Sequence, residues 1–224
     1  MSIVRTDNEF NNFYEEYAVS TQNIYEKGNN YNVYEQVFFR AFDILFAILA
    51  FIVSVPIMLV TILLIRLESP GSAFYVQKRV GLNGNYFNMY KFRSMHINAE
   101  IDGPQWAKKD DNRVTKVGKI IRKMRIDELP QLLNVLVGDM SLIGPRPERP
   151  NFTAEFNNDI PDFVLRLSVK PGLTGWAQVN GGYEITPHDK LLLDLYYVKH
   201  KSLKLDILII IKTIKVIFTG EGAR

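Results

Sequence analysis

The feature that most constrains this chain is an uncharged, strongly apolar run from Ile44 to Ile65. A helix over this run would rise about 33 Å, which matches the hydrocarbon thickness of a bilayer. The run begins too far into the chain, and is too long, to be a secretory signal. A buried helix of a soluble protein is the alternative, but such helices are rarely so long and so apolar. The run therefore predicts a membrane-embedded helix.

A proline interrupts this run at its middle. Pro56 removes a backbone donor and clashes with the preceding turn, so the helix should kink there. Ser54 can hydrogen-bond a carbonyl group freed by the break. Such a helix either crosses the bilayer or enters and leaves on the same side. Arg40 before the run and Arg66 after it favour two cytoplasmic ends, and hence a re-entrant helix.

The rest of the chain divides around this helix. Residues 1–35 are rich in Asn, Tyr and Glu and lack apolar periodicity, which predicts a mobile or loosely docked extension. Residues 36–68 form the predicted re-entrant membrane helix, and residues 69–224 a further domain with membrane-interface helices. After residue 35 bases outnumber acids, which suits anionic lipid head groups or phosphorylated substrates. No nucleic-acid-binding signature is present, so nucleic acid is not an expected partner.

Local patterns predict a mostly helical α+β fold. Residues 74–93 alternate apolar and polar side chains around a Gly/Asn turn, which is typical of a β-hairpin. Residues 115–126 form a basic amphipathic helix, suited either to a membrane surface or to solvent. A helix begins at Pro130, and Gly138 follows its end. Further expectations are an ordered glycine-rich loop, a helix, and a second helix in the core or at the interface: residues 170–182, 188–199 and 203–218.

Asp127 and Glu128 are the acidic residues best placed for chemistry. They precede the helix start, where backbone N–H groups and the helix dipole favour carboxylates. Arg122 and neighbouring bases should keep at least one of them ionised, as a nucleophile on phosphorus or a Mg²⁺ ligand must be. By position alone, however, acids before a helix are more often caps.

Two cations outside this segment are candidates for binding phosphate. Arg146 lies between the prolines of GPRP, which either presents its guanidinium rigidly to phosphate or simply holds a turn. Lys91, in YKFRSM, either adds charge around a diphosphate or lies at the surface. The chain has no cysteine, zinc-like histidine spacing, P-loop or GxSxG elbow, so thiol, zinc and serine-hydrolase chemistry are not expected.

The order of these motifs resembles the monotopic phosphoglycosyl transferases, bacterial sugar transferases that prime exopolysaccharide, capsule and related glycan synthesis. The similarity covers about residues 36–224. DELPQ with GDMSLIGPRP is its most specific part; YKFRSM precedes that block, and KPGLTGWAQVNG and DLYYV follow it.

The resemblance implies transfer of hexose-1-phosphate from a UDP-sugar to polyprenyl (undecaprenyl) phosphate, with release of UMP. Asp127 would attack the β-phosphate and carry the phospho-sugar, and Glu128 would activate the polyprenyl phosphate. Mg²⁺ would bridge Asp127 and the diphosphate. Lys91, Arg122 and Arg146 would lie near the phosphates. The resemblance also implies a re-entrant helix at the cytoplasmic face of the bacterial inner membrane, in contact with membrane lipids. Residues 69–224 would then form a cytoplasmic catalytic domain with membrane-interface helices, and a homodimer is compatible with the resemblance.

Two positions depart from small members of the family. Val55 stands where they commonly have Ser before the membrane proline, and Gly182 stands where they often have an Arg that contacts substrate. The helix break and the contacts of that loop should therefore differ. Two other functions remain as alternatives: a hydrolase of nucleotide sugars or lipid diphosphates that uses the same acids, and a non-catalytic membrane scaffold for glycan assembly.

Overall fold

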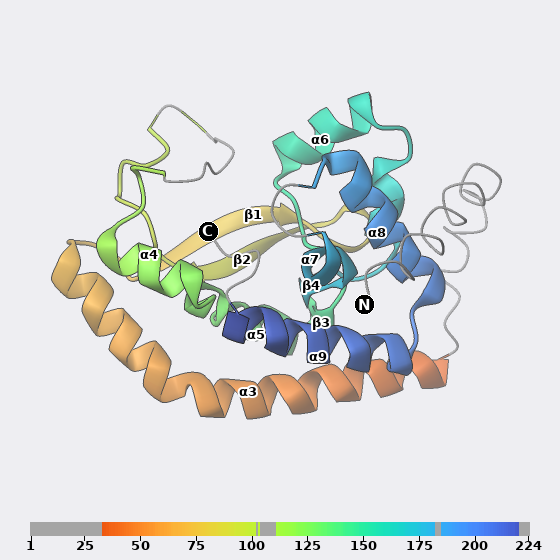
Figure 1. Ribbon diagram of the computed structural model, residues 1–224, viewed down its shortest axis with the longest axis horizontal. Helices are drawn as coiled ribbons and strands as arrows, with labels where there is room; N and C mark the ends of the chain where they lie inside the picture. Colours follow the sequence, from red (N-terminus) through yellow and green to blue (C-terminus); the bar gives the residue numbers. More distant parts are fainter. Residues whose placement is uncertain (1–32, 102, 104–110, 182–184, 220–224) are drawn as a thin grey trace.

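The computed structural model describes residues 33–101, 103, 111–181 and 185–219. Most of the predicted extension at residues 1–35, and Gly182, therefore lie outside the described residues. The described part is mostly helical, with an antiparallel hairpin and a short parallel pair of strands (Figure 1). This confirms the mostly helical α+β class and the small hairpin.

The hairpin consists of β1 (Phe74–Val80) and β2 (Tyr86–Phe92), paired antiparallel as predicted. Tyr75 lies opposite Lys91 in the register. Because side chains alternate along a strand, Tyr75, Gln77 and Arg79 share one face of β1. This face lines the cavity described below.

The predicted basic helix is α4 (Lys116–Lys123), capped by Thr115, whose hydroxyl accepts from the N–H of Gly118 at 2.9 Å. Arg125 then adopts a left-handed conformation with φ 54°, which separates α4 from a 3₁₀ turn at Ile126–Glu128. α5 (Gln131–Val137) follows Pro130, and Gly138 ends it at φ 98°. The predicted start and stop of this helix are confirmed.

One pairing was not expected. β3 (Ser141–Ile143) and β4 (Gly172–Thr174) run parallel, and α7 (Trp176–Asn180) follows β4, so the prediction of a loop over 170–182 was wrong. The reason is close contact between backbones. A Cβ on Gly172 would lie 2.1 Å from the backbone nitrogen of Gly144, so these glycines permit close packing rather than a loop.

The remaining elements build the main core. They are α6 (Pro150–Asp159), a 3₁₀ segment at Phe163–Ser168, α8 (Pro187–His200) and α9 (Leu203–Thr219). α8 and α9 confirm the helices predicted at 188–199 and 203–218. α8 supplies much of the largest buried cluster, and α9 adds the fully buried Ile209 to it. Other apolar side chains of α9, among them Ile207, Ile211 and Ile214, are exposed.

α3 (Val33–Glu68) is one continuous helix of 36 residues that contains Pro56 and changes direction midway (Figure 1). Within the described residues, α3 is the one helix that is long and apolar enough to cross a membrane. Ser54 is buried, and its hydroxyl donates to the carbonyl of Phe51 at 3.0 Å. In a regular helix Pro56 would leave the carbonyl of Ile52 without a donor. The hydroxyl of Ser54 bonds instead to the carbonyl of Phe51, one residue earlier.

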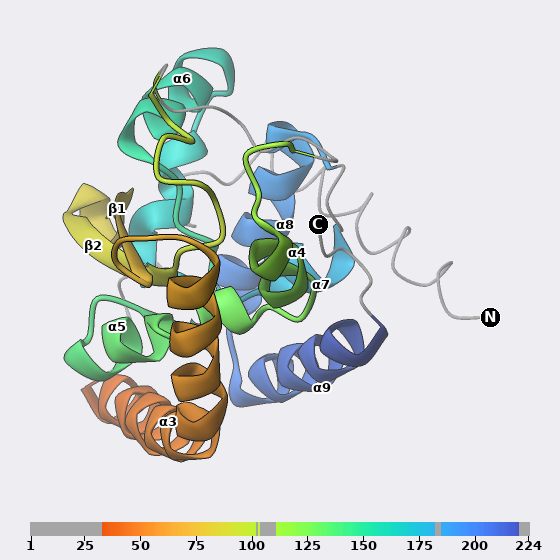
Figure 2. The same cartoon turned by 90° about the vertical axis from the view of Figure 1, so that its left-hand side faces the viewer.

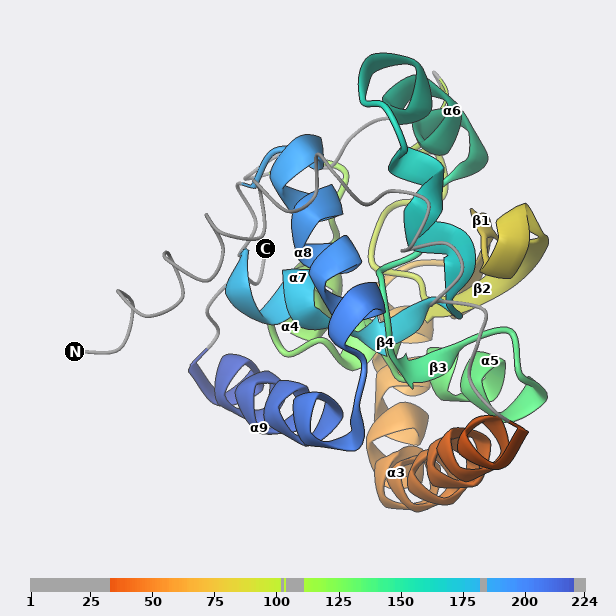
Figure 3. The same cartoon turned by 90° about the vertical axis from the view of Figure 1, so that its right-hand side faces the viewer.

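Both ends of α3 are joined to the rest of the described chain by polar contacts. Near the start, Arg40 donates to the last carbonyls of α5, and Asp43 accepts from Ser141 Oγ and Leu142 N, each at 2.9 Å. At the end, Glu68 accepts from the first N–H groups of α4. Between these contacts a buried stripe faces the domain: Ala47, Ser54, Met58, Thr61 and Ile65. α3 and α9 lie along the same side of the molecule (Figure 1, Figure 2 and Figure 3).

Candidate active site

A cavity of about 420 Å³ is lined by residues of the hairpin, α4, the 3₁₀ turn at Ile126–Glu128 and the segment that leads into α6. This volume lies within the usual range for small-molecule sites. The cavity contains the five side chains predicted for catalysis and phosphate binding: Lys91, Arg122, Asp127, Glu128 and Arg146. The predicted helix-break residues, Ser54 and Pro56, lie in α3 and do not line it.

Positive charge dominates the lining. Besides the predicted cations, further basic side chains reach the cavity: Arg79, Arg93, Arg113, Arg125, Arg149 and Lys190. Four acids line it as well: Glu100, Asp127, Glu128 and Glu148. A cavity of this sign favours polyanions such as diphosphates over neutral ligands.

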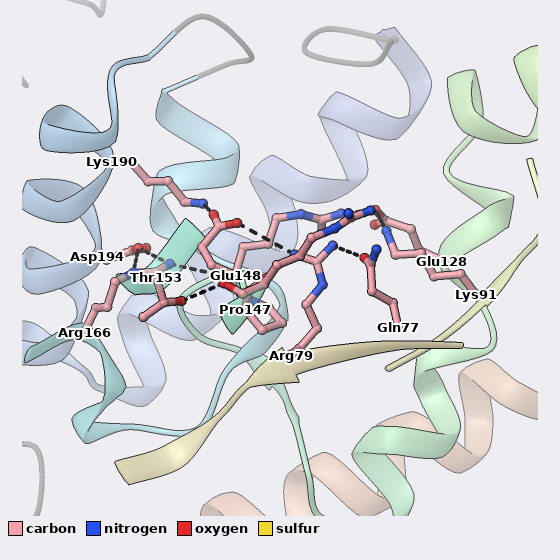
Figure 4. A network of polar contacts seen from close by, with 12 residues as sticks. Gln77, Arg79, Lys91, Glu128, Pro147, Glu148, Thr153, Arg166, Lys190 and Asp194 are labelled. Atoms are coloured by element: carbon pink, nitrogen blue, oxygen red, sulfur yellow. Dashed lines mark hydrogen bonds and ion pairs between the residues drawn. The ribbon is translucent and has the colours of Figure 1, made fainter. Parts of the chain in front are cut away.

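Glu128 is the acid most firmly held by these cations. Its carboxylate pairs with the Arg146 guanidinium, with Lys91 Nζ at 3.5 Å, and with Arg125 Nη1 at 3.9 Å. Figure 4 shows Glu128 and Lys91 at one end of this polar network. Burial by itself raises the pKa of Glu128, but Arg146 and Lys91 outweigh it and hold the pKa well below its usual range. Glu128 is therefore ionised in the unliganded site.

Asp127 is in a different electrostatic setting although it is the adjacent residue. It is 8% exposed and has no ion pair within 4.0 Å among the described residues. Burial, together with the charge of Glu128, raises the pKa of Asp127 to about 6, against the opposing effect of Lys91, Arg122 and Arg146. Asp127 is thus ionised in most molecules at neutral pH, and its oxygens are available to a ligand in the cavity.

The pKa of Lys91 is also shifted by its surroundings. Burial, and then the neighbouring Arg146 charge, lower the pKa of Lys91 to about 8, although Glu128 and Asp127 act in the opposite direction. An incoming phosphate would restore a favourable partner for this ammonium group. The site therefore holds cations that are only partly compensated before a ligand arrives.

The GPRP loop (Gly144–Pro147) is fixed by residues that sequence patterns did not single out. Arg79 Nη1 donates to the carbonyl of Pro147 at 3.0 Å (Figure 4). Glu148 pairs with Lys190, and with Arg79 at 3.7 Å. The only sequence signal was proximity, because Glu148 directly follows GPRP. Arg79 and Lys190 come from β1 and α8, so only the fold brings them together.

The donor set fits a divalent cation that arrives with its substrate. The described residues contain no group of three or more His, Cys, Asp or Glu side chains able to hold a metal. Glu128 is occupied by cations, which leaves Asp127 as the carboxylate able to bind one. Mg²⁺ commonly takes one or two carboxylates, with substrate phosphates and water completing its shell.

Known proteins are similar in sequence to this chain over most of its length. The sequence model of the bacterial sugar transferases matches residues 34–220. A relative from Aeromonas hydrophila, named UDP-N-acetylgalactosamine-undecaprenyl-phosphate N-acetylgalactosaminephosphotransferase, is 53% identical over 83% of this chain and 44% of its own length. An undecaprenyl-phosphate glucose phosphotransferase from Komagataeibacter xylinus is 43% identical over 79% of this chain and 35% of its own.

A relative of more similar length occurs in Caulobacter vibrioides. It is named UDP-glucose:undecaprenyl-phosphate glucose-1-phosphate transferase and is 41% identical over 82% of this chain and 71% of its own. The chain spans less than half the length of the Aeromonas and Komagataeibacter relatives. Since the family match covers both the apolar helix and the cation-lined cavity, the chain belongs to the bacterial sugar transferase family.

Proposed function

We propose that this chain transfers hexose-1-phosphate from a UDP-sugar to undecaprenyl or a related polyprenyl phosphate, through a covalent aspartyl phospho-sugar. The observation that carries the proposal is the split between two adjacent acids in one cation-lined cavity. Asp127 has no ion pair within 4.0 Å among the described residues, whereas Glu128 is held by Arg146 and Lys91. Relatives named as undecaprenyl-phosphate sugar phosphotransferases support the same reaction.

In the first step an oxygen of Asp127 forms a bond to the β-phosphorus of the UDP-sugar. The bond from that phosphorus to the bridging oxygen breaks, and UMP leaves with the electron pair. Lys91, Arg122 and Arg146 bind the phosphate oxygens and offset their charge. Mg²⁺, when held by Asp127 and the diphosphate, would offset more of that charge.

In the second step the polyprenyl phosphate takes over the phospho-sugar. The substrate phosphates compete with Glu128 for Arg146 and Lys91, and this releases the carboxylate from the partners that keep it a weak base. Glu128 can then assist the lipid phosphate, whose oxygen attacks phosphorus while the Asp127 carboxylate leaves. The products are the polyprenyl-diphosphate-sugar and regenerated enzyme.

We further propose that α3 is re-entrant at the cytoplasmic face of the inner membrane. Arg40 and Asp43 at one end, and Glu68 at the other, bond to the same catalytic domain. A helix that crossed the bilayer would place one end beyond reach of that domain. The exposed apolar surfaces of α3 and α9, on the same side of the molecule, would contact membrane lipids.

The test is release of UMP by purified protein. With Mg²⁺, a UDP-hexose and undecaprenyl phosphate, we expect lipid-dependent UMP formation. Asp127→Asn should abolish turnover, and Asp159→Asn, the same change at an exposed residue of α6, should leave it unchanged. Near-normal turnover by Asp127→Asn would exclude this nucleophile, and steady UMP formation without lipid would indicate a hydrolase instead.

A further inference from the structure

Two guanidinium groups, of the buried Arg166 and the partly buried Arg79, hold consecutive carbonyl groups of the GPRP loop. Arg166 Nη2 donates to the carbonyl of Arg146 at 2.7 Å, and Arg79 Nη1 donates to the carbonyl of Pro147 at 3.0 Å. Since prolines have no N–H group, this stretch offers few donors for a regular backbone ladder. Side chains from distant segments therefore set the direction in which Arg146 points.

Arg166 is in turn fixed by Asp194 of α8 (Figure 4). Asp194 Oδ2 accepts from Arg166 Nε at 2.8 Å and from Nη2 at 2.6 Å. Both side chains are 1% exposed, and the guanidinium lies 5.2 Å from the ring centroid of Phe163. The pair is thus rigidly packed, and Nη2 of Arg166 also donates to the GPRP loop.

This pair lies behind the active site rather than in it. Neither Arg166 nor Asp194 is among the described residues that line the cavity. A substrate in the cavity would not touch them. The pair reaches the site through its bond to the Arg146 carbonyl, and its charges also act on Glu148 and Lys190 in the cavity lining. Arg146 is the guanidinium that pairs with Glu128.

We propose that Arg166 and Asp194 are positioning residues for the transfer reaction: they fix the backbone of Arg146 so that its guanidinium meets Glu128 and the incoming diphosphate. This inference rests on the proposed function for its role in turnover. A buried ion pair is weak evidence for stability, because apolar residues can often replace it without loss of the fold. The buried geometry of this pair therefore supports a positioning role.

The sharpest test replaces both partners together. Arg166→Met with Asp194→Leu leaves no unpaired buried charge, so the thermal midpoint should stay near that of the wild type. Because Arg146 loses its bracing, kcat should fall by about one to two orders of magnitude. Ser168→Ala is the control, since this buried hydroxyl lies in the same 3₁₀ segment but bonds only to the Leu165 carbonyl within it.

A double-mutant cycle separates positioning from general damage. The variant with both Arg166→Met and Asp194→Leu is called the Met/Leu variant. If the pair acts through Arg146, adding Arg146→Gln to the Met/Leu variant should lower kcat little more than Arg146→Gln alone does. Fully additive losses would overturn the proposal.

A readout independent of turnover keeps this inference distinct from the proposed function. Phenylglyoxal labelling of Arg146, followed by mass spectrometry, should be slow in the wild type and in Ser168→Ala. It should be faster in Glu128→Gln and, to a similar extent, in the Met/Leu variant. If the Met/Leu variant does not fold, Arg166→Lys, which keeps the charge but not the forked geometry, is labelled in its place. Wild-type labelling rates in the variant would refute positioning, whereas absence of wild-type UMP release would refute only the proposed function.

Discussion

At the scale of single residues, the central feature is that two adjacent acids differ in their pKa. Glu128 is held ionised by Arg146 and Lys91, whereas burial and the charge of Glu128 raise the pKa of Asp127 to about 6. Separate environments for paired carboxylates are a common way to divide catalytic roles. The sequence motif predicts the pair of acids but not which carboxylate is held ionised, because only the fold brings Arg146 and Lys91 to Glu128.

These values predict a bell-shaped pH dependence. Asp127 must be ionised to attack, so activity should be lost as pH falls through about 6. Lys91 must be protonated to bind phosphate, so activity should also be lost as pH rises through about 8. The quantity to measure is kcat/KM for the UDP-sugar, which in a two-step exchange reports the first step and excludes ionisation of the lipid phosphate.

Lys91→Arg provides the control for this profile. A guanidinium stays charged throughout the accessible range, so the variant should keep the acid limb and lose the alkaline one. An alkaline limb that is unchanged in Lys91→Arg would show that another group is responsible.

At the scale of elements, local sequence signals predicted the helices and the hairpin, but they did not predict contacts between distant segments. The hairpin, α4, α5, α8 and α9 follow from periodicity, caps and turn residues that lie within each segment. The pairing of β3 with β4 joins segments on either side of α6, and no local pattern encodes it. For the same reason Arg79, Lys190 and the pair of Arg166 with Asp194 were not predicted as parts of the site or its support.

The contact between glycine backbones predicts a large effect from a single methyl group. Gly172→Ala would place a Cβ 2.1 Å from the backbone nitrogen of Gly144, which cannot move without displacing the GPRP loop. We expect the free energy of unfolding to fall by about 3 kcal/mol, and turnover to fall with it.

The matched control is Gly84→Ala in the hairpin turn. Gly84 has φ +80° but no heavy atom within 4 Å of an added Cβ, so only backbone strain of about 1 kcal/mol is expected. Thermal or denaturant unfolding of both variants checks the comparison. Equal destabilisation would show that the backbone contact at Gly172 carries no special cost.

At the scale of the whole molecule, the other described elements lie on one side of the bent helix α3 (Figure 1). The cavity is lined by the hairpin, α4 and the turn at Ile126–Glu128. The buried stripe of α3 packs against the domain along the helix, and the opposite surface is apolar and exposed. This arrangement would keep a water-soluble diphosphate and a lipid-held phosphate within reach of one carboxylate.

The re-entrant topology predicts that both ends of α3 face the cytoplasm. The chain has no cysteine, so single cysteines give an unambiguous label. Gln36→Cys, in the first turn of α3, and Ser72→Cys, just beyond its last residue, place thiols at exposed positions near the two ends of the helix, whereas Ser69 is half-buried. A membrane-impermeant thiol reagent should label both from the cytoplasmic side only. Labelling of the two sites from opposite sides would indicate a spanning helix.

The central claim is that Asp127 forms a covalent bond to the phospho-sugar, and intact-protein mass spectrometry tests it most directly. Protein mixed with a UDP-hexose and Mg²⁺, without lipid, should gain the mass of one hexose phosphate while releasing UMP. The adduct should map to Asp127, be absent from Asp127→Asn, and disappear when undecaprenyl phosphate is added. Lipid-dependent turnover without any such adduct, or an adduct that persists in Asp127→Asn, would contradict the account.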